Sequence, residues 1–483
     1  MGGLLATLVT SASALNAYDQ VLQVTENNVA NASTPGYARQ TQTLVAEPFD
    51  PSVGTIGGVR AGEVQSSRDE YAEQAVQQQT TLLGAATQSV NSLTSLQSNF
   101  DITGDSGIPL ALNNLLQAFS AWGQTPNDSN AQQSVIDQAS DLASAFQDTA
   151  NGIGTVVQDT NQQLQQTTTQ INSLVSQLQQ YNQDVMQGDH NDAGLDAQVY
   201  STLEQLSQYA SFTSTQQTDG TVNVMLNGQT PLLIEGQQYQ IHFNLAQPQN
   251  PAPVNANAPP LAQITASDGT DITSSITTGQ LGALLTMRNT TLPSYIGDGS
   301  QQGSLNSMAQ QFADTVNQLL TSGNVSDGPP AQTGVPLFTY DSSDPTGIAA
   351  SLAVSPSISG SQLAAIDPGP PEVANGIALA LAGLADPQGA SGEINGESFS
   401  EFYGDMASQV GSALSAATNQ QQVQQSAVTQ AQNLRQQASG VDLDQEAMTL
   451  VQFQQAYEAN SKMVSVLDTL SEDLIDILTS TTT

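Results

Sequence analysis

Residues 4–31 read LLATLVTSASALNAYDQVLQVTENNVAN, and their apolar side chains recur at alternating intervals of four and three residues. This spacing is the heptad pattern of a helix that packs along one stripe against another helix. The first stripe, the N-terminal seam, consists of Leu4, Leu8, Ser11, Leu15, Tyr18, Leu22, Thr25 and Val29. A C-terminal seam repeats the pattern at Leu450, Phe453, Tyr457, Asn460, Val464, Leu467, Ser471, Leu474 and Leu478. Both ends of the chain are therefore predicted to form long helices that need helical partners.

Helical periodicity extends well beyond the two seams. Heptad patterns run over residues 72–100 and 157–185, with shorter amphipathic stretches at 112–122 and 135–146 between them. We expect the chain up to about residue 185 to be helical, apart from an irregular segment near residues 32–65. The helical period returns at residues 305–319 and again from residue 398 to the end.

Two regions carry β-strand signals instead. Val222, Val224 and Leu226 alternate with polar residues, and Asp219-Gly220 and Asn227-Gly228 are typical hairpin turns. Similar alternation at residues 239–243, a Pro/Asn/Ala stretch at 248–260 and a short run at 261–276 complete a compact β insert. A Gly/Pro-rich stretch at 323–371, with a strand candidate at 335–340, predicts a second, smaller insert.

The predicted fold class is mainly α with β inserts, a multidomain chain whose N- and C-terminal helices pair in a coiled-coil-like bundle. Residues 1–70 and 441–483 would be terminal assembly helices, disordered in the monomer. A helical core domain would comprise residues 71–205, 279–322 and 372–440. The β insert would be residues 206–278, and the small β-rich insert residues 323–371.

The two seams are weak, because polar Ser11 and Thr25 interrupt the first one and few charges are available for helix-stabilising pairs. We expect both ends to be mobile in the monomer and to order when neighbouring copies cover them. An ordinary coiled coil within one chain is the alternative, and periodicity does not decide between the two.

Composition excludes several classes of function. The net charge is −38, from 44 acidic residues against six basic ones: Arg39, Arg60, Arg68, Arg288, Arg435 and Lys462. Nucleic acid and anionic membrane are therefore not expected as partners. The chain has no cysteine, which excludes disulfides and thiolate chemistry. It shows neither an apolar run long enough to cross a membrane nor the basic start of a cleavable signal peptide.

Candidate chemistry is sparse. His190, in Asp189-His190-Asn191-Asp192, could ligate a metal, but it lacks a spaced ligand set and a solvated loop is the favoured interpretation. His242 is expected at a strand edge or packed, and Trp122 in the core. Asp442 and Asp444 are expected to cap a helix. No P-loop, Rossmann or nucleophile-elbow signature is present, so we predict no enzyme activity and no cofactor or metal.

Residues 26–40, ENNVANASTPGYARQ, resemble the signature of flagellar rod, hook and hook-associated proteins, an N-N-x-A/S-N run followed by T-P-G-Y-x-R-Q. Pro35 fixes φ and Gly36 permits positive φ, so a turn must end the first helix here and deliver Tyr37 and Arg39 at a defined angle. Arg39 would bind a carboxylate either on a neighbouring copy or within its own chain, and both alternatives stay open.

The C-terminal segments 439–446 and 453–460 resemble the matching signature of the same axial proteins. Residues 112–146, 280–323 and 374–384 resemble the hook-associated subfamily at the junction of hook and filament. This chain departs from that subfamily near position 132, where an arginine is common, and at residues 195–199, where a charged stretch is usual. The ion pairs of those sites are in doubt.

The resemblance implies an extracellular structural subunit, exported unfolded by the flagellar type III apparatus without a cleaved signal. Implied partners are copies of itself, the hook protein, the next hook-associated protein toward the filament, and an export chaperone at the C-terminal helix. The terminal helices would be innermost and the β inserts would face outward. The alternatives are a hook, rod or filament protein, or a secreted adhesin or hydrolase with coiled-coil ends.

The predicted assembly interface combines the apolar residues of both seams with the signature turn. Its members are Leu4, Leu8, Leu15, Tyr18, Leu22, Val29, Asn27, Asn28, Asn31, Pro35, Gly36, Tyr37, Arg39, Leu450, Phe453, Tyr457, Asn460, Val464, Leu467, Leu474 and Leu478.

Overall fold

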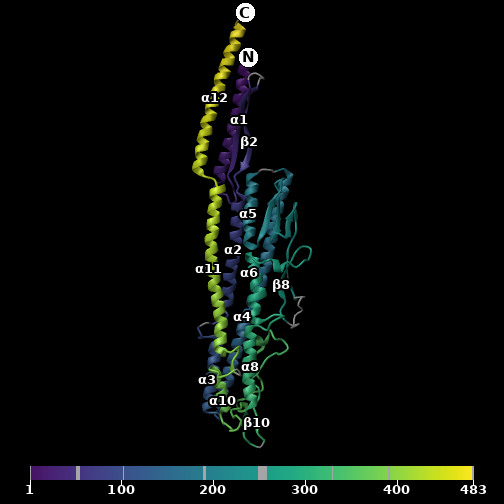
Figure 1. Cartoon of the computed structure of the whole chain (residues 1–483), viewed down its shortest axis with the longest axis vertical. Coiled ribbons are helices and arrows are strands. Elements are labelled where there is room, and N and C mark those ends of the chain that lie inside the picture. Colours follow the sequence, from purple (N-terminus) through teal and green to yellow (C-terminus); the bar gives the residue numbers. More distant parts are fainter. Residues whose placement is uncertain are drawn as a thin grey trace.

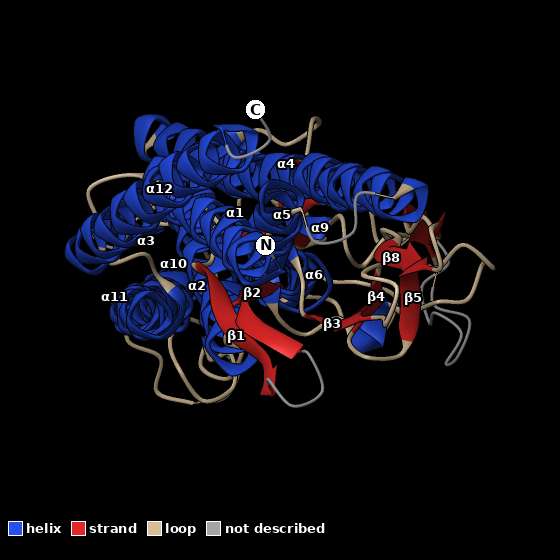
Figure 2. Ribbon diagram, turned by 90° about the horizontal axis from the view of Figure 1, so that it is seen from above, coloured by secondary structure: helices blue, strands red, loops and turns tan. Residues whose placement is uncertain are grey.

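The computed structural model is a long, narrow rod with both chain ends at the same end of the molecule (Figure 1). It describes residues 2–50, 55–101, 103–188, 192–247, 258–328, 330–389 and 392–480. Helices run along the length of the rod, and the β structure lies on its side (Figures 1 and 2). The mainly α fold with β inserts and paired terminal helices is thereby confirmed.

Helices make up most of the rod. They are α1 Gly2–Asn31, α2 Glu70–Gln97, α3 Gly107–Gln124, α4 Ser129–Gln187, α5 Ala193–Tyr209, α6 Gly279–Thr286, α7 Leu292–Ile296, α8 Ser304–Ser322, α9 Ile348–Ser351, α10 Gly376–Ala382, α11 Phe399–Ser439 and α12 Leu443–Ser480. A single π-helical turn at Met287–Thr291 joins α6 to α7.

The strands form small antiparallel sheets. A hairpin of β1 Gln40–Asp50 and β2 Thr55–Ser66 lies beside α1. The larger β insert holds a four-stranded sheet in the order β3 Phe212–Gln216, β4 Val222–Leu226, β5 Thr230–Ile234 and β6 Gln237–Gln238, and a pair of β7 His242–Ala246 with β8 Leu261–Thr265. The smaller insert holds β9 Asn324–Ser326 with β10 Gln332–Thr333 and β11 Phe338–Thr339 with β12 Ala353–Val354.

The prediction of an irregular segment near residues 32–65 was wrong, because most of it forms the β1–β2 hairpin. Its strands are largely exposed, so they do not alternate between apolar and polar residues as a half-buried strand would. A shift of register between Gln42 and Leu44 disturbs the periodicity further.

Helix α4 also differs from expectation, since one continuous helix of 59 residues replaces two separate amphipathic stretches. The glycines between those stretches do not break it. A Cβ at Gly152 would collide with the side chain of Asn99, so the glycine allows the end of α2 to approach α4 closely.

Two apolar cores lie along the rod. The first surrounds Trp122, Phe119, Phe146, Phe312 and Phe399, and joins α3, the first part of α4, α8, α10 and the start of α11. The second packs the later part of α4 and helix α5 against the four-stranded sheet and α6. Trp122 is fully buried, which confirms its predicted place in the core. Neither core includes a residue of α1 or α12.

Candidate assembly interface

The two chain ends form an antiparallel helix pair, α1 with α12, at one end of the rod (Figure 1). The Tyr18 and Phe453 rings lie 5.9 Å apart between their centroids. Nearer the end of the rod, Asn460 donates a hydrogen bond of 3.4 Å to the carbonyl oxygen of Ser11. The two predicted seams therefore face one another within a single chain.

On α1, the buried line follows small side chains rather than the leucines of the seam. The buried residues are Ser11, Ala14, Ala17, Val21, Thr25 and Asn28. The seam residues Leu4, Leu8, Leu15, Tyr18 and Leu22 are half-buried, and Val29 is 42% exposed. The cause is that α1 lies between α12 and the β1–β2 hairpin, where small residues allow both neighbours to approach.

Helix α12 is covered on one side only. The seam residues Leu450, Phe453, Asn460, Val464, Leu467 and Leu474 are half-buried, Tyr457 is 38% exposed, and the side chain of Leu478 lies outside the described residues. Between residues 447 and 477 no side chain is buried. An outer face of α12, made of Met448, Val451, Val466 and Leu470, is 49 to 68% exposed.

The signature turn follows α1 directly and lies on α5. Gly36 has φ of 75°, a left-handed conformation that the T-P-G-Y sequence predicted. A Cβ at this position would collide with the carbonyl oxygen of Ala197. Gly36 is thus required both by the turn and by its close contact with α5.

Asn28 explains why this signature needs an amide side chain. Its Oδ1 accepts from the backbone N–H of Gln40 at 2.8 Å and from the Tyr37 hydroxyl at 3.0 Å. Its Nδ2 donates to the Gln40 carbonyl at 2.8 Å and to Glu446 at 3.1 Å. Only a group with both a donor and an acceptor satisfies this buried position. Asn27 is exposed and Asn31 is half-buried, and the two bond to each other instead.

Arg39 forms its ion pair within the chain, with 2.6 Å between Nε and Oε1 of Glu446. This answers the question that the sequence left open. The Glu446 side chain is 2% exposed, so the charge pair is largely shielded from water. Burial, together with the negative charge of Glu446, raises the pKa of Tyr37 to about 12. Asp442 caps α12 by accepting from the N–H groups of residues 444 and 445, as predicted.

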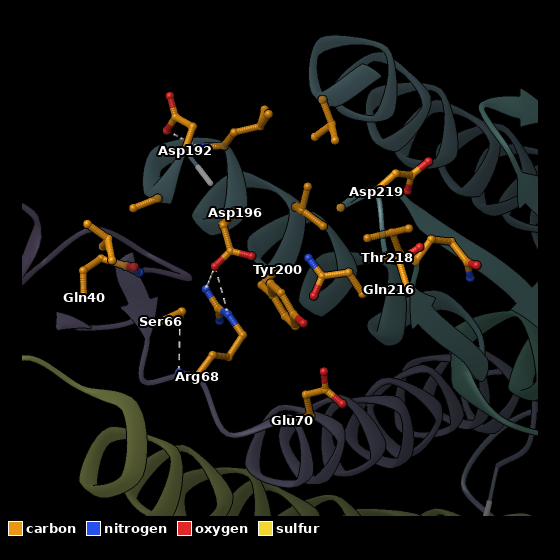
Figure 3. A pocket seen from close by; sticks show the side chains of 18 residues that line it. Gln40, Ser66, Arg68, Glu70, Asp192, Asp196, Tyr200, Gln216, Thr218 and Asp219 are labelled. Carbon is orange, nitrogen blue, oxygen red and sulfur yellow. Dashed lines mark hydrogen bonds and ion pairs between the residues drawn. The ribbon is translucent and has the colours of Figure 1, made fainter. Parts of the chain in front are cut away.

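No motif in the sequence predicted the ion cluster beneath the turn. Arg68 contacts Glu73 at 2.6 Å. It also contacts Asp196 at 2.7 Å, and its guanidinium lies 3.7 Å from the centre of the Tyr200 ring (Figure 3). Asp196 belongs to the stretch, residues 195–199, where this chain departs from the pattern that it otherwise resembles, so an ion pair does form there. The only sequence signal was the rarity of basic residues in so acidic a chain.

A polar cleft of about 780 Å³ opens beside Arg68 (Figure 3). Its walls come from the base of the β1–β2 hairpin, the start of α2, the first turns of α5 and the β3–β4 turn at residues 216–220. The cleft therefore marks the boundary between the terminal helices and the rest of the rod.

The other candidate residues stay apart from this interface. His242 is exposed on β7, which pairs with β8 alone, so it is an edge residue as expected. His190 lies outside the described residues. The described part of the chain contains no cluster of three metal-ligating side chains. None of its helices is long and apolar enough to cross a membrane.

The turn signature at residues 26–40 and the pairing of the two chain ends place this chain in the class of axial flagellar subunits. Comparisons with known protein families agree with this class. Residues 8–37 match the flagella basal body rod protein family, and residues 432–477 match the flagellar basal body rod FlgEFG protein C-terminal family. Residues 93–338, about half of the chain, match the helical domain of the flagellar hook-associated protein FlgK. The chain belongs to the FlgK family of flagellar hook-associated proteins, structural components of the flagellum at the hook–filament junction.

Individual relatives are consistent with this family. Flagellar hook-associated protein 1 of Bacillus subtilis is 26% identical over 97% of both chains. The Escherichia coli protein of the same name is 34% identical over 95 residues, 20% of this chain and 17% of that protein. The flagellar hook junction protein FlgK from Burkholderia pseudomallei shares the fold, with a TM-score of 0.61 at 17% identity, over 75% of this chain and 99% of that chain. The hook-associated interpretation is therefore confirmed over the hook, rod, filament and adhesin alternatives.

Proposed function

We propose that this chain joins the hook to the filament by burying the outer faces of α1 and α12 between copies of itself, without any enzymatic activity. The observation that carries the proposal is the exposure of α12. In the described part of the chain, twenty-three large apolar side chains are exposed, and twelve of them lie on α1 and α12. So much apolar surface concentrated on two helices marks a protein–protein interface.

The outer face of α12 could supply substantial free energy on assembly. Its four side chains are about half exposed, and complete burial of each would contribute roughly 1 kcal/mol. Every neighbour that covers this face adds such a contribution, so ordering of the ends and assembly are coupled.

Charge opposes the approach of two copies, since each carries a net charge of −38. Four of the six basic residues are engaged inside the chain: Arg39, Arg68 and Arg435 in ion pairs, and Arg288 buried against Asn161 and the carbonyl oxygen of Pro260. Arg60 and Lys462 are exposed. Apolar burial, rather than ion pairing, is therefore the driving force that we propose, and added salt would assist it by screening the repulsion.

The same proposal extends to partners, domains and location. We assign the hook protein and the next hook-associated protein as neighbours in the flagellum, and an export chaperone that covers α12 before assembly. Residues 1–70 and 441–483 would be the assembly helices, disordered in the monomer, attached to the core and inserts at the predicted boundaries. The protein would act outside the cell after export without a cleaved signal. The rod-family matches at both ends and the uncovered face of α12 support these assignments.

Matched substitutions on two helices test the proposal. Val466 on α12 and Val423 on α11 are 59% and 60% exposed. Val466→Asp should abolish filament attachment in cells that lack the native protein, so that filament subunits are shed into the medium. Val423→Asp should retain filaments. Retention by both variants, or loss in both, would contradict a role for α12 in particular.

Limited proteolysis of the purified monomer, followed by mass spectrometry, tests the coupled ordering. We expect rapid loss of roughly the first 40 to 70 and the last 40 residues, because their seams lack covering neighbours. Ends that resist cleavage as well as α4 and α8 would contradict coupling between ordering and assembly.

A further inference from the structure

The terminal unit, residues 2–66 and 443–480, is connected to the rest of the rod by two short segments. One is residues 67–69, between β2 and α2, and the other is residues 439–442, from the last residue of α11 to α12. The two segments lie side by side, because the N–H of Asp69 donates to the hydroxyl of Ser439 at 2.9 Å. We call these two segments, together with the signature turn that packs on them, the joint. Contacts that fix the joint also fix the direction of the terminal helices.

Arg68 lies inside the joint and binds three different parts of the chain. Its Nη1 donates to Glu73 at the start of α2, at 2.6 Å. Its Nη2 donates to Asp196 on α5 and to the carbonyl oxygen of Gly36 in the signature turn, both at 2.7 Å. The side chain is 6% exposed. A planar guanidinium can hold several acceptors at once, which a single ammonium group does not reproduce.

The cluster extends from Arg68 to α11. The Glu73 side chain, 4% exposed, also accepts from Arg435 at 3.1 Å, and Arg435 binds Glu204 on α5 at 2.7 Å. Positive and negative groups therefore alternate through the joint. Each buried carboxylate would be left with an unpaired charge if the cluster opened, so the arrangement favours one geometry.

The signature turn is held at the same place from its other side. The N–H of Arg39 donates to the carbonyl oxygen of Ser439 at 2.9 Å, and the carbonyl oxygen of Arg39 accepts from the N–H of Ser67 at 2.8 Å. Gly36 lies directly against the backbone of α5. The turn thus touches both connecting segments and the core.

We propose that Arg68 is a positioning residue: it fixes the signature turn on α5, and so sets the direction in which the terminal unit leaves the core within each copy. This inference rests on the proposed function, because that direction matters only if the terminal helices are buried between copies. It also predicts where order ends in the monomer. The joint stays ordered, which narrows the disorder proposed above for residues 1–70 and 441–483: it begins beyond the joint, in α1 and α12.

Hydrogen exchange of the full-length monomer, read by mass spectrometry, tests the inference. In the wild type, peptides that contain Arg39, Gln40, Ser67 and Asp69 should exchange slowly, because their N–H groups are bonded in the joint. Arg68→Gln should speed this exchange at least tenfold, and Arg68→Lys should fall in between. Arg60→Gln is the matched control, since Arg60 is 61% exposed and its contact to Glu47 is 3.8 Å long.

Peptides from α3 and α8 report on the core in the same experiment. If they exchange faster in Arg68→Gln to the same extent as the joint, Arg68 is merely stabilising and the positioning role is wrong. Slow joint exchange in Arg68→Gln, or unprotected joint peptides in the wild type, would also overturn it. Asp196→Asn is the second variant, which keeps the Glu73 pairs and should loosen the turn without affecting the core.

The hydrogen-exchange test of Arg68 can succeed or fail independently of the proposed function. Val466→Asp should leave exchange at the joint unchanged while filaments are lost. If Val466→Asp cells keep their filaments, the assembly proposal fails, and the exchange of the joint peptides still decides whether Arg68 holds the turn.

Discussion

Helices α11 and α12 follow one another in the chain and have similar lengths, 41 and 38 residues, yet their surroundings differ. Phe399, Tyr403, Met406 and Val410 of α11 are buried in the first core, and farther along, Val428 is buried as well. On α12 no side chain between residues 447 and 477 is buried. Both helices begin with a capped first turn. Local sequence thus makes both segments helical, whereas only neighbours decide which one belongs to a folded core.

The largest expected effect lies on α11. Phe399→Ala should destabilise the core by about 3 to 5 kcal/mol, because it empties a buried site against Phe312, 5.1 Å away between ring centroids. Urea unfolding measures the loss. Phe453→Ala on α12, where the ring is half-buried against α1, should cost about 1 kcal/mol or less. Equal losses would show that α12 is as firmly packed as α11.

A smaller effect is expected at Glu446, the one buried residue between residues 443 and 477 of α12. Glu446→Ala should cost about 2 kcal/mol, because Arg39 and Asn28 lose a charged hydrogen-bond partner. Thermal unfolding followed by circular dichroism is the measurement. Glu47→Ala serves as the control, since its contact with Arg60 is exposed and should be worth less than about 0.5 kcal/mol.

Titration of one tyrosine in the joint and one in the core at alkaline pH compares how well the two regions are packed. Burial raises the pKa of both Tyr37 and Tyr403 to about 12, from an ordinary value near 10. The unfolded chain therefore releases these protons first, so the stabilisation is complete below pH 10 and is lost as the pH rises to about 12. We expect a loss of about 1 kcal/mol for Tyr403 at pH 11, and a smaller loss for Tyr37, because solvent partly screens its surroundings.

Tyrosinate absorbance of Tyr37→Phe and Tyr403→Phe, subtracted from that of the wild type, isolates each group. A Tyr37 that titrates near pH 10 while Tyr403 does not would mean that the joint is open in the monomer.

The smallest effect on the monomer is expected at the outer face of α12. Leu470→Ser should change the unfolding free energy by less than about 0.5 kcal/mol, because the side chain is 49% exposed and has little packing to lose. The urea midpoint checks this. A loss of 2 kcal/mol or more would show that something within the same chain already covers this face.

Much of the fold could be predicted from periodicity, because helix and hairpin signals are local. Residues 305–319 fall inside α8, and Asn227-Gly228 forms the predicted turn with φ of 50° and 70°. The β1–β2 hairpin was missed since an exposed ribbon has no buried face to alternate against. The division of α4 was wrong because Gly152 serves a neighbouring helix rather than a break.

The candidate assembly interface could likewise be predicted only where its signals are local. Pro35 and Gly36 predicted a turn from two adjacent residues, whereas the partners of Arg68 and Arg435 lie up to 362 residues away along the chain. No local pattern connects such positions. Asn28 was selected through the resemblance, and the structure supplies the reason, which is a bond to Glu446 across 418 residues.

The pairing of α1 with α12 affects the order in which the parts of the chain can fold. Ser11 lies against Met463, 452 residues later in the chain, so α1 can meet its helical partner only when nearly the whole polypeptide is available, although the β1–β2 hairpin beside it follows directly. Contacts of such long range form late in folding. A chain whose α12 segment is not yet available cannot complete the terminal unit.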